Sequence, residues 1–131
     1  MREILFRAKL KSYNDERDNY FVSGSFQKCL SGKCRIHYLN GGNDVVKEET
    51  VGQYINMNDI KGNKIFEGDI LENCVGEKGI VEIDEFGIRM ELAFNDFEYF
   101  SQKDLISYGV KIIGNIYDNE ELIKKVRNDE Q

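Results

Sequence analysis

The chain of 131 residues has the size of one domain, and at that length folding can hide roughly 65–70% of the unfolded surface. Hydrophobic residues make up 40% of the chain, including 7 Tyr and 8 Phe, which excludes a disordered protein. The formal net charge of −6 repels phosphate backbones and anionic lipid headgroups, so a general nucleic-acid-binding protein is disfavoured.

Charged side chains interrupt the first apolar stretch, "MREILFRAKLKSYNDERDNY". The stretch is therefore too short for a signal peptide or a membrane span, and we expect a cytoplasmic protein. Three cysteines, an odd number, agree with a reducing compartment.

Apolar residues recur mostly with period two, which is typical of half-buried strands. In "EILFRAKL" at 3–10 the alternation predicts one face made of Ile4, Phe6, Ala8 and Leu10. Glu3, Arg7 and Lys9 should lie on the other face, and Leu5 breaks the pattern.

The region 12–45 predicts a loop, then a strand from Tyr20 to Leu30 that Gly24 bends or bulges, and then a hairpin. If Ser31-Gly32 is a two-residue turn, Cys29 lies opposite Cys34 and the two thiols sit side by side. A second turn follows at "LNGGND".

Further strands are predicted at 50–55, 69–75, 79–84, 88–94 and 110–117, with an ambiguous stretch around "DFEYFSQKDLISYG". They follow one another too closely for parallel crossovers, so we expect an antiparallel meander that curls into a small barrel over 50–117. We interpret the glycine-containing stretch at 50–71 as a corner rather than a site. The whole chain, 1–131, is predicted to be a single domain.

A helix is predicted over 118–131, with Asp118 or Asn119 as its N-cap. Leu122, Ile123 and Val126 make a narrow apolar stripe, which predicts weak docking and a frayed end.

Four soft ligands could in principle hold zinc: Cys29, Cys34, His37 and Cys74. Their spacing lacks paired knuckles, and His37 should face away from Cys34, so we favour hairpin packing and a buried Cys74. A Cys29–Cys34 disulfide is geometrically conceivable but disfavoured in the cytoplasm.

Catalytic patterns are weak. His37 is the one histidine, and no base or acid pairs with it in sequence. Glu67 and Asp69 in "FEGDI" fit ordinary turn chemistry, and phosphate-binding loops are absent. We therefore predict no catalytic residue, no cofactor and no metal.

The segment "NDFEYF" at 95–100 carries more aromatic residues than one strand face can bury. Phe97, Tyr99 and Phe100 are therefore a candidate contact patch. The alternative is a corner wrapped into the core.

Three segments together, "MREILFRA" at 1–8, "TVGQYINMNDIKGNKIFEGDI" at 50–70 and "VKIIGNIYDNEELI" at 110–123, resemble the YopX family of phage and prophage proteins. The chain departs from the family pattern at Lys9 and Leu10, where a Trp is common, and at Glu120, where many members have Pro. The stretch 12–45 matches no family motif. The resemblance implies a mostly β fold related to rolled SH3-like barrels, a phage origin and no assigned activity.

The leading functional hypothesis is a non-enzymatic interaction module, which offers strand edges or the 95–100 patch to a protein partner or to its own copies. The alternative is a small barrel that binds nucleic acid through Arg7, Lys9, Lys11 and aromatics. A third is an enzyme or metal protein that uses Cys29, Cys34 and Cys74.

Overall fold

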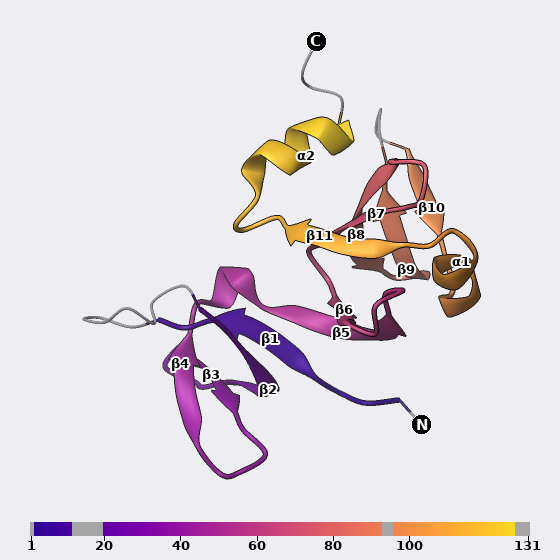
Figure 1. Cartoon of the computed structure of the whole chain (residues 1–131). Helices are drawn as coiled ribbons and strands as arrows, with labels where there is room; N and C mark the ends of the chain where they lie inside the picture. Colours follow the sequence, from indigo (N-terminus) through magenta and orange to yellow (C-terminus); the bar gives the residue numbers. More distant parts are fainter. Residues whose placement is uncertain (1, 12–19, 93–95, 128–131) are drawn as a thin grey trace. The chain divides into compact units, whose positions relative to one another are not determined.

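The computed structural model describes residues 2–11, 20–92 and 96–127, which form a mostly β chain of antiparallel strands with two short α-helices (Figure 1). This confirms the predicted fold class at that level. The chain divides into two compact units, residues 1–54 and 55–131, called here the N-terminal and C-terminal units. Each unit is described by itself, and the single domain over 1–131 stays a prediction.

The N-terminal unit is an antiparallel sheet in the order β4-β3-β2-β1-β5. Its side chains alternate between the two faces, and one face forms a core around Ala8, Cys34, Ile36 and Val46. The elements are β1 (Phe6–Lys9), β2 (Phe21–Lys28), β3 (Cys34–His37), β4 (Asn43–Val46), the 3₁₀ turn η1 (Glu48–Thr50) and the start of β5 (Gly52–Asn58).

The first strand is shorter than predicted, because pairing starts only at Phe6. Ile4 therefore lies outside the sheet and is 76% exposed, so its prediction as a core residue is wrong. Ala8 and Leu10 are buried as predicted. Lys9 was expected on the solvent face but is also buried, with its backbone amide donating to Thr50 Oγ1 at 2.8 Å.

β2 changes partners halfway along its length. Residues 21–24 pair with β1, and residues 25–28 pair with β3. At the changeover, a Cβ on Gly24 would lie 2.2 Å from the His37 carbonyl oxygen, so only glycine fits there. The sequence predicted a bend or bulge at Gly24, and the structure shows that its role is a close backbone approach.

The predicted register of the β2–β3 hairpin is wrong by one residue. Lys28 pairs with Cys34, and the Cys29 amide donates to the Lys33 carbonyl at 2.8 Å. The loop therefore has three residues and ends on Gly32 at φ 93°, the left-handed position that such a loop requires. Because a slip of one residue turns side chains to the opposite face, Cys29 does not face Cys34.

The C-terminal unit contains a five-stranded antiparallel sheet in the order β10-β9-β8-β7-β11. Its strands are β7 (Asp69–Glu72), β8 (Lys78–Asp84), β9 (Gly87–Glu91), β10 (Phe97–Tyr99) and β11 (Lys111–Asn115). β6 (Lys64–Phe66) pairs with the end of β5, and the helices are α1 (Gln102–Ser107) and α2 (Glu120–Arg127). Within the described residues of 50–117, the ends of this sheet are not paired with each other, so no closed barrel is seen.

Each face of this sheet has its own core. Ile55, Ile65, Leu71 and Val81 pack on one side together with Leu105 of α1. On the other side, Ile70 and Ile80 pack against Val126 of α2, which is 2% exposed.

Helix α2 is anchored more firmly than the predicted weak docking. Besides the burial of Val126, Arg127 donates two hydrogen bonds to the buried Glu91, one of them from Nη2 to Oε1 at 3.0 Å. Asn119 directly precedes the helix, but its side chain accepts the Asn115 amide at 3.0 Å. Residues 128–131 of the predicted helix lie outside the described residues.

The stretch 50–71 is a pair of turns between strands, as predicted. Asp59 accepts the amides of Lys61 and Asn63 at 3.0 and 2.9 Å across the first turn. Asp69 accepts the Phe66 amide at 2.8 Å across the second, where Gly68 has φ 95°. The carboxylates here close corners.

Candidate functional site

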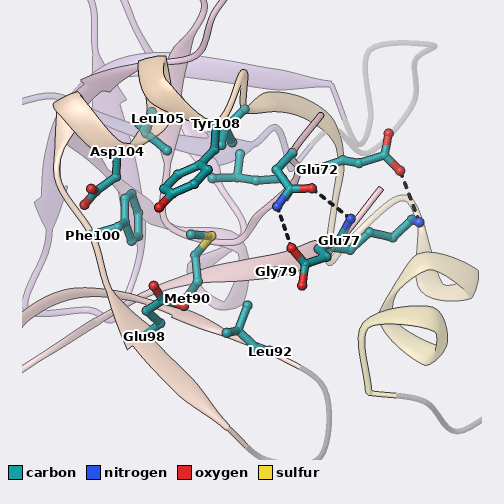
Figure 2. A pocket seen from close by; sticks show the side chains of 14 residues that line it. Glu72, Glu77, Gly79, Met90, Leu92, Glu98, Phe100, Asp104, Leu105 and Tyr108 are labelled. Atoms are coloured by element: carbon teal, nitrogen blue, oxygen red, sulfur yellow. Dashed lines mark hydrogen bonds and ion pairs between the residues drawn. The ribbon is translucent and has the colours of Figure 1, made fainter. Parts of the chain in front are cut away.

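The C-terminal unit contains a cavity of about 280 Å³, called here the hollow (Figure 2). It lies on the α1 side of the sheet, at the ends of β7, β8 and β9. Its walls are apolar and are formed by Leu71, Met90, Leu92, Phe100, Leu105 and Val110. Its remaining lining residues are Glu72, Asn73, Glu77, Lys78, Gly79, Glu98, Asp104 and Tyr108.

Gly79 creates part of this space. It pairs with Leu71 in the sheet, and a Cβ at Gly79 would lie 3.0 Å from Met90 Sδ and 3.2 Å from Leu92 Cδ2. Any other residue would push these side chains into the hollow or fill it. Glycine in the interior of a strand often marks a place where another group must approach closely.

Helix α1 forms one wall of the hollow. Ser101 caps it by a reciprocal pair of bonds, in which the Asp104 amide donates to Ser101 Oγ and the Ser101 amide donates to Asp104 Oδ2. This cap holds the helix over the sheet, with Leu105 buried in the core.

The rim of the hollow is acidic. It carries four carboxylates, from Glu72, Glu77, Glu98 and Asp104, and one ammonium group, from Lys78. In Figure 2, Asp104 and Glu98 lie on one side of the opening and Glu72 and Glu77 on the other.

The carboxylates differ in the groups with which they already interact. Lys78 Nζ lies 3.1 Å from Glu72 Oε2, and Asn73 Nδ2 donates to Glu77 Oε1 at 2.9 Å. Glu98 is exposed, and its side chain makes no hydrogen bond or ion pair with the described part of the chain. The arrangement can hold an apolar group while its acidic rim attracts a cation beside that group.

The structure divides the predicted contact patch between the two faces of the sheet. Phe100 and Glu98 line the hollow, whereas Phe97 and Tyr99 belong to the opposite face. Phe97 is 40% exposed, with Arg89 Cζ 3.8 Å from its ring centroid. The role of these three aromatic residues as a contact patch stays a prediction.

Tyr99 is 50% exposed, and its hydroxyl donates to Asp84 Oδ2 at 2.7 Å. This bond raises the pKa of Tyr99 and lowers that of Asp84. Tyr99 is therefore oriented by the sheet, since a hydrogen bond to the charged carboxylate holds its ring in place.

β10 is also an end of the five-stranded sheet. Within the described residues it has a strand partner on one side only. It is three residues long, and the Phe97 amide is already bonded to Asp96 Oδ1 at 3.0 Å. An edge this short offers few backbone groups to an incoming strand.

The proposed soft ligands are not brought together. Cys34 is buried in the N-terminal unit, and burial raises the pKa of its thiol. Cys29 is half-buried, and Cys74 is exposed, which corrects the expectation that Cys74 is a buried residue. All three thiols are free, so the Cys29–Cys34 disulfide is not formed.

His37 shares a hydrogen bond of 2.7 Å with Gln27 through Nε2. Across residues 2–11, 20–92 and 96–127, no group of three or more His, Cys, Asp or Glu residues could hold a metal ion. Nor is any described helix long and apolar enough to cross a membrane.

Sequence reasoning missed the hollow, because its walls come from segments up to about 40 residues apart whose register must be known first. One part could have been found: the pattern Ser101-x-x-Asp104 is a helix-capping signal that predicts α1. Gly79 alone carries no such signal.

Comparison with known protein families gives the same family that the three sequence segments resemble. The family model described as YopX protein matches residues 6–124, so the chain belongs to the YopX family. A comparison with curated proteins gave no match.

Proposed function

We propose that this member of the YopX family is a non-enzymatic protein-interaction module, and that the hollow is where it holds its partner. The partner supplies a large apolar side chain, which enters the hollow, with cationic residues beside it. The observation that carries this proposal is the combination of apolar walls and an acidic rim in one concave site.

The size of the hollow suits a side chain better than a cofactor. Sites for small molecules and cofactors usually measure roughly 300–1,000 Å³ and enclose most of the ligand. At about 280 Å³ the hollow lies just below that range, and it is not fully enclosed. Protein interfaces concentrate their binding energy in a few anchor side chains that fill pockets of this kind.

The rim selects the charge of the partner. Three of the four rim carboxylates remain after Lys78 has neutralised one, so a basic segment is attracted and an acidic one is repelled. Because the groups are exposed, this attraction weakens as salt rises.

The experiment compares two labelled eight-residue peptides by fluorescence anisotropy, each with a central Leu, one flanked by Lys and the other by Glu. We expect the Lys peptide to bind and the Glu peptide not to bind. The variant Glu98→Lys should weaken the Lys peptide about threefold to tenfold. The control is Glu85→Lys, an exposed carboxylate outside the hollow, which should leave binding unchanged. Equal binding of both peptides, or no effect of Glu98→Lys, contradicts the proposal.

A second candidate function is nucleic-acid binding by the N-terminal unit. Arg7 Cζ and Lys9 Nζ lie 4.4 and 5.1 Å from the centroid of the Phe21 ring, so cations and an aromatic ring share one surface. Against this candidate, Lys9 is buried. If single-stranded oligonucleotides do not bind at low salt, this candidate is rejected.

The proposal also includes three broader expectations. The strands over 50–117 belong to the rolled SH3-like type, the protein has a phage or prophage origin, and it acts in the cytoplasm of the bacterial host. The family resemblance supports the first two expectations, and no described helix is long and apolar enough to cross a membrane.

A further inference from the structure

We infer that the hollow binds the tip of the β2–β3 hairpin of a second copy of this chain. The tip is defined as residues 29–33, with Leu30 as the apolar anchor and Lys33 as the cation. This inference rests on the proposed function and names the partner for that same site.

The hairpin tip has the chemistry that the hollow selects. Leu30 is the first residue of the three-residue loop and is 111% exposed, and Lys33 follows at the start of the returning arm. Lys28 is already paired with Glu48 at 2.7 Å. Lys33 makes no ion pair with the described residues, so its ammonium group is available to a partner.

The tip is also held in shape before it binds. The Cys29 amide donates to the Lys33 carbonyl at 2.8 Å, and the Gly32 amide donates to the Cys29 carbonyl at 2.9 Å. A loop that is fixed in advance loses less conformational entropy on binding, so one anchor side chain contributes more to affinity.

The charge of the chain is divided in a way that favours contact between unlike ends of two copies. Residues 1–54 carry nine Lys or Arg and seven Asp or Glu, a net charge of +2. Residues 55–131 carry nine Lys or Arg and seventeen Asp or Glu, a net charge of −8. A contact between the hairpin of one copy and the hollow of another joins opposite charges, although whole chains of net charge −6 repel one another.

Such a contact uses two different surfaces, so it is heterologous and can continue from copy to copy. This property gives a sharp test. A copy with a damaged tip still has an intact hollow, and a copy with a damaged hollow still has an intact tip. A mixture of the two should stop at a dimer.

The experiment measures sedimentation velocity of the full chain from micromolar to millimolar concentration. Wild type should self-associate, and Leu30→Ser should weaken association at least about tenfold. Lys33→Glu and Glu98→Lys should each weaken it about threefold to tenfold, and the double variant should recover to within about twofold of wild type. At a concentration where neither variant associates by itself, mixing Leu30→Ser with Glu98→Lys should give a dimer and nothing larger.

The matched control is Leu39→Ser, which removes a leucine that is equally exposed on the next hairpin turn. It should leave association unchanged. Circular dichroism of each variant verifies that it is folded.

Three results would overturn the inference. One is a monomer at every concentration, and the second is association that Leu30→Ser leaves unchanged. The third is a difference in hydrodynamic size between wild type and Leu30→Ser that is the same at every concentration. The last means that the tip occupies the hollow of its own chain. If the Lys peptide binds the hollow while the protein stays monomeric, the inference fails and the proposed function stands.

Discussion

Asp59 shows how one carboxylate can organise the turn between β5 and β6. Its Oδ1 accepts the amides of Lys61 and Asn63, and its Oδ2 accepts the Ile112 amide of β11 at 3.0 Å. Burial alone would raise the pKa of Asp59, but these amide donors outweigh burial and hold the pKa below its ordinary value. The negative charge is therefore part of the folded structure.

We expect Asp59→Asn to lower the free energy of unfolding by about 1–3 kcal/mol, because the neutral amide accepts fewer of these hydrogen bonds and brings donors of its own. Urea denaturation measures the loss. Asp96→Asn is the control, since Asp96 is exposed and accepts the amide of its own neighbour, Phe97; it should cost less than about 0.5 kcal/mol. Equal losses would contradict the role given to Asp59.

The same residue predicts a pH dependence. The pKa of Asp59 is lower in the folded chain than its unfolded value of about 3.9, so the folded state binds fewer protons between these two values. Its contribution to stability is complete above the unfolded pKa and is lost as the pH falls through the folded pKa. The difference between wild type and Asp59→Asn should therefore be largest near neutral pH and shrink below about pH 4. A difference that persists undiminished well below pH 4 would argue against a charged Asp59.

At the scale of elements, β2 depends on a glycine where it changes partners. Gly24→Ala should lower the free energy of unfolding by about 3 kcal/mol, because the new Cβ meets the carbonyl of His37, which cannot move without breaking the β2–β3 ladder. The control is Gly42→Ala, where the nearest atom, Tyr38 Cδ2, is 3.5 Å away and the backbone φ is not positive. Similar stability of the two variants would show that the sheet can open at Gly24.

Helix α2 is held by the buried Val126, by the partly buried Leu122 and Ile123 that pack on the same core, and by the ion pair of Arg127 with Glu91. Val126→Ala should cost about 1–3 kcal/mol, because it leaves a space between the helix and Ile70 and Ile80. Val75→Ala removes the same atoms from an exposed site and should change stability by less than about 0.5 kcal/mol. Thermal unfolding followed by circular dichroism compares the two. If Val126→Ala behaves like Val75→Ala, the helix does not depend on this contact.

Period-two alternation was enough to predict most strands, because a half-buried strand repeats its environment every second residue. β4, β6 and β10 were missed, since three or four residues are too few to show a period. The hairpin register was missed because Ser31-Gly32 fits either a two-residue or a three-residue loop, and only the position of the left-handed glycine distinguishes them. α1 carried a capping signal, but its six residues cover less than two turns of periodicity.

At the scale of the whole molecule, the feature that the sequence conceals is the hollow. Its residues are apolar or acidic at positions that each look ordinary, and they share a site only after the order of β7 to β10 is known. The division of charge between residues 1–54 and 55–131, by contrast, can be read from the sequence once the boundary of the units is known. The apolar hollow with its acidic rim therefore lies in the acidic unit of a chain whose other unit is mildly basic.

The most direct measurement is a nuclear magnetic resonance titration of ¹⁵N-labelled protein with the eight-residue Lys peptide. We predict that amide shifts change at residues of the hollow, including Gly79, Met90, Leu92 and Phe100, and that added salt reduces the changes. Shifts that cluster around Phe21 instead, or a spectrum that the peptide leaves unchanged, would contradict the account.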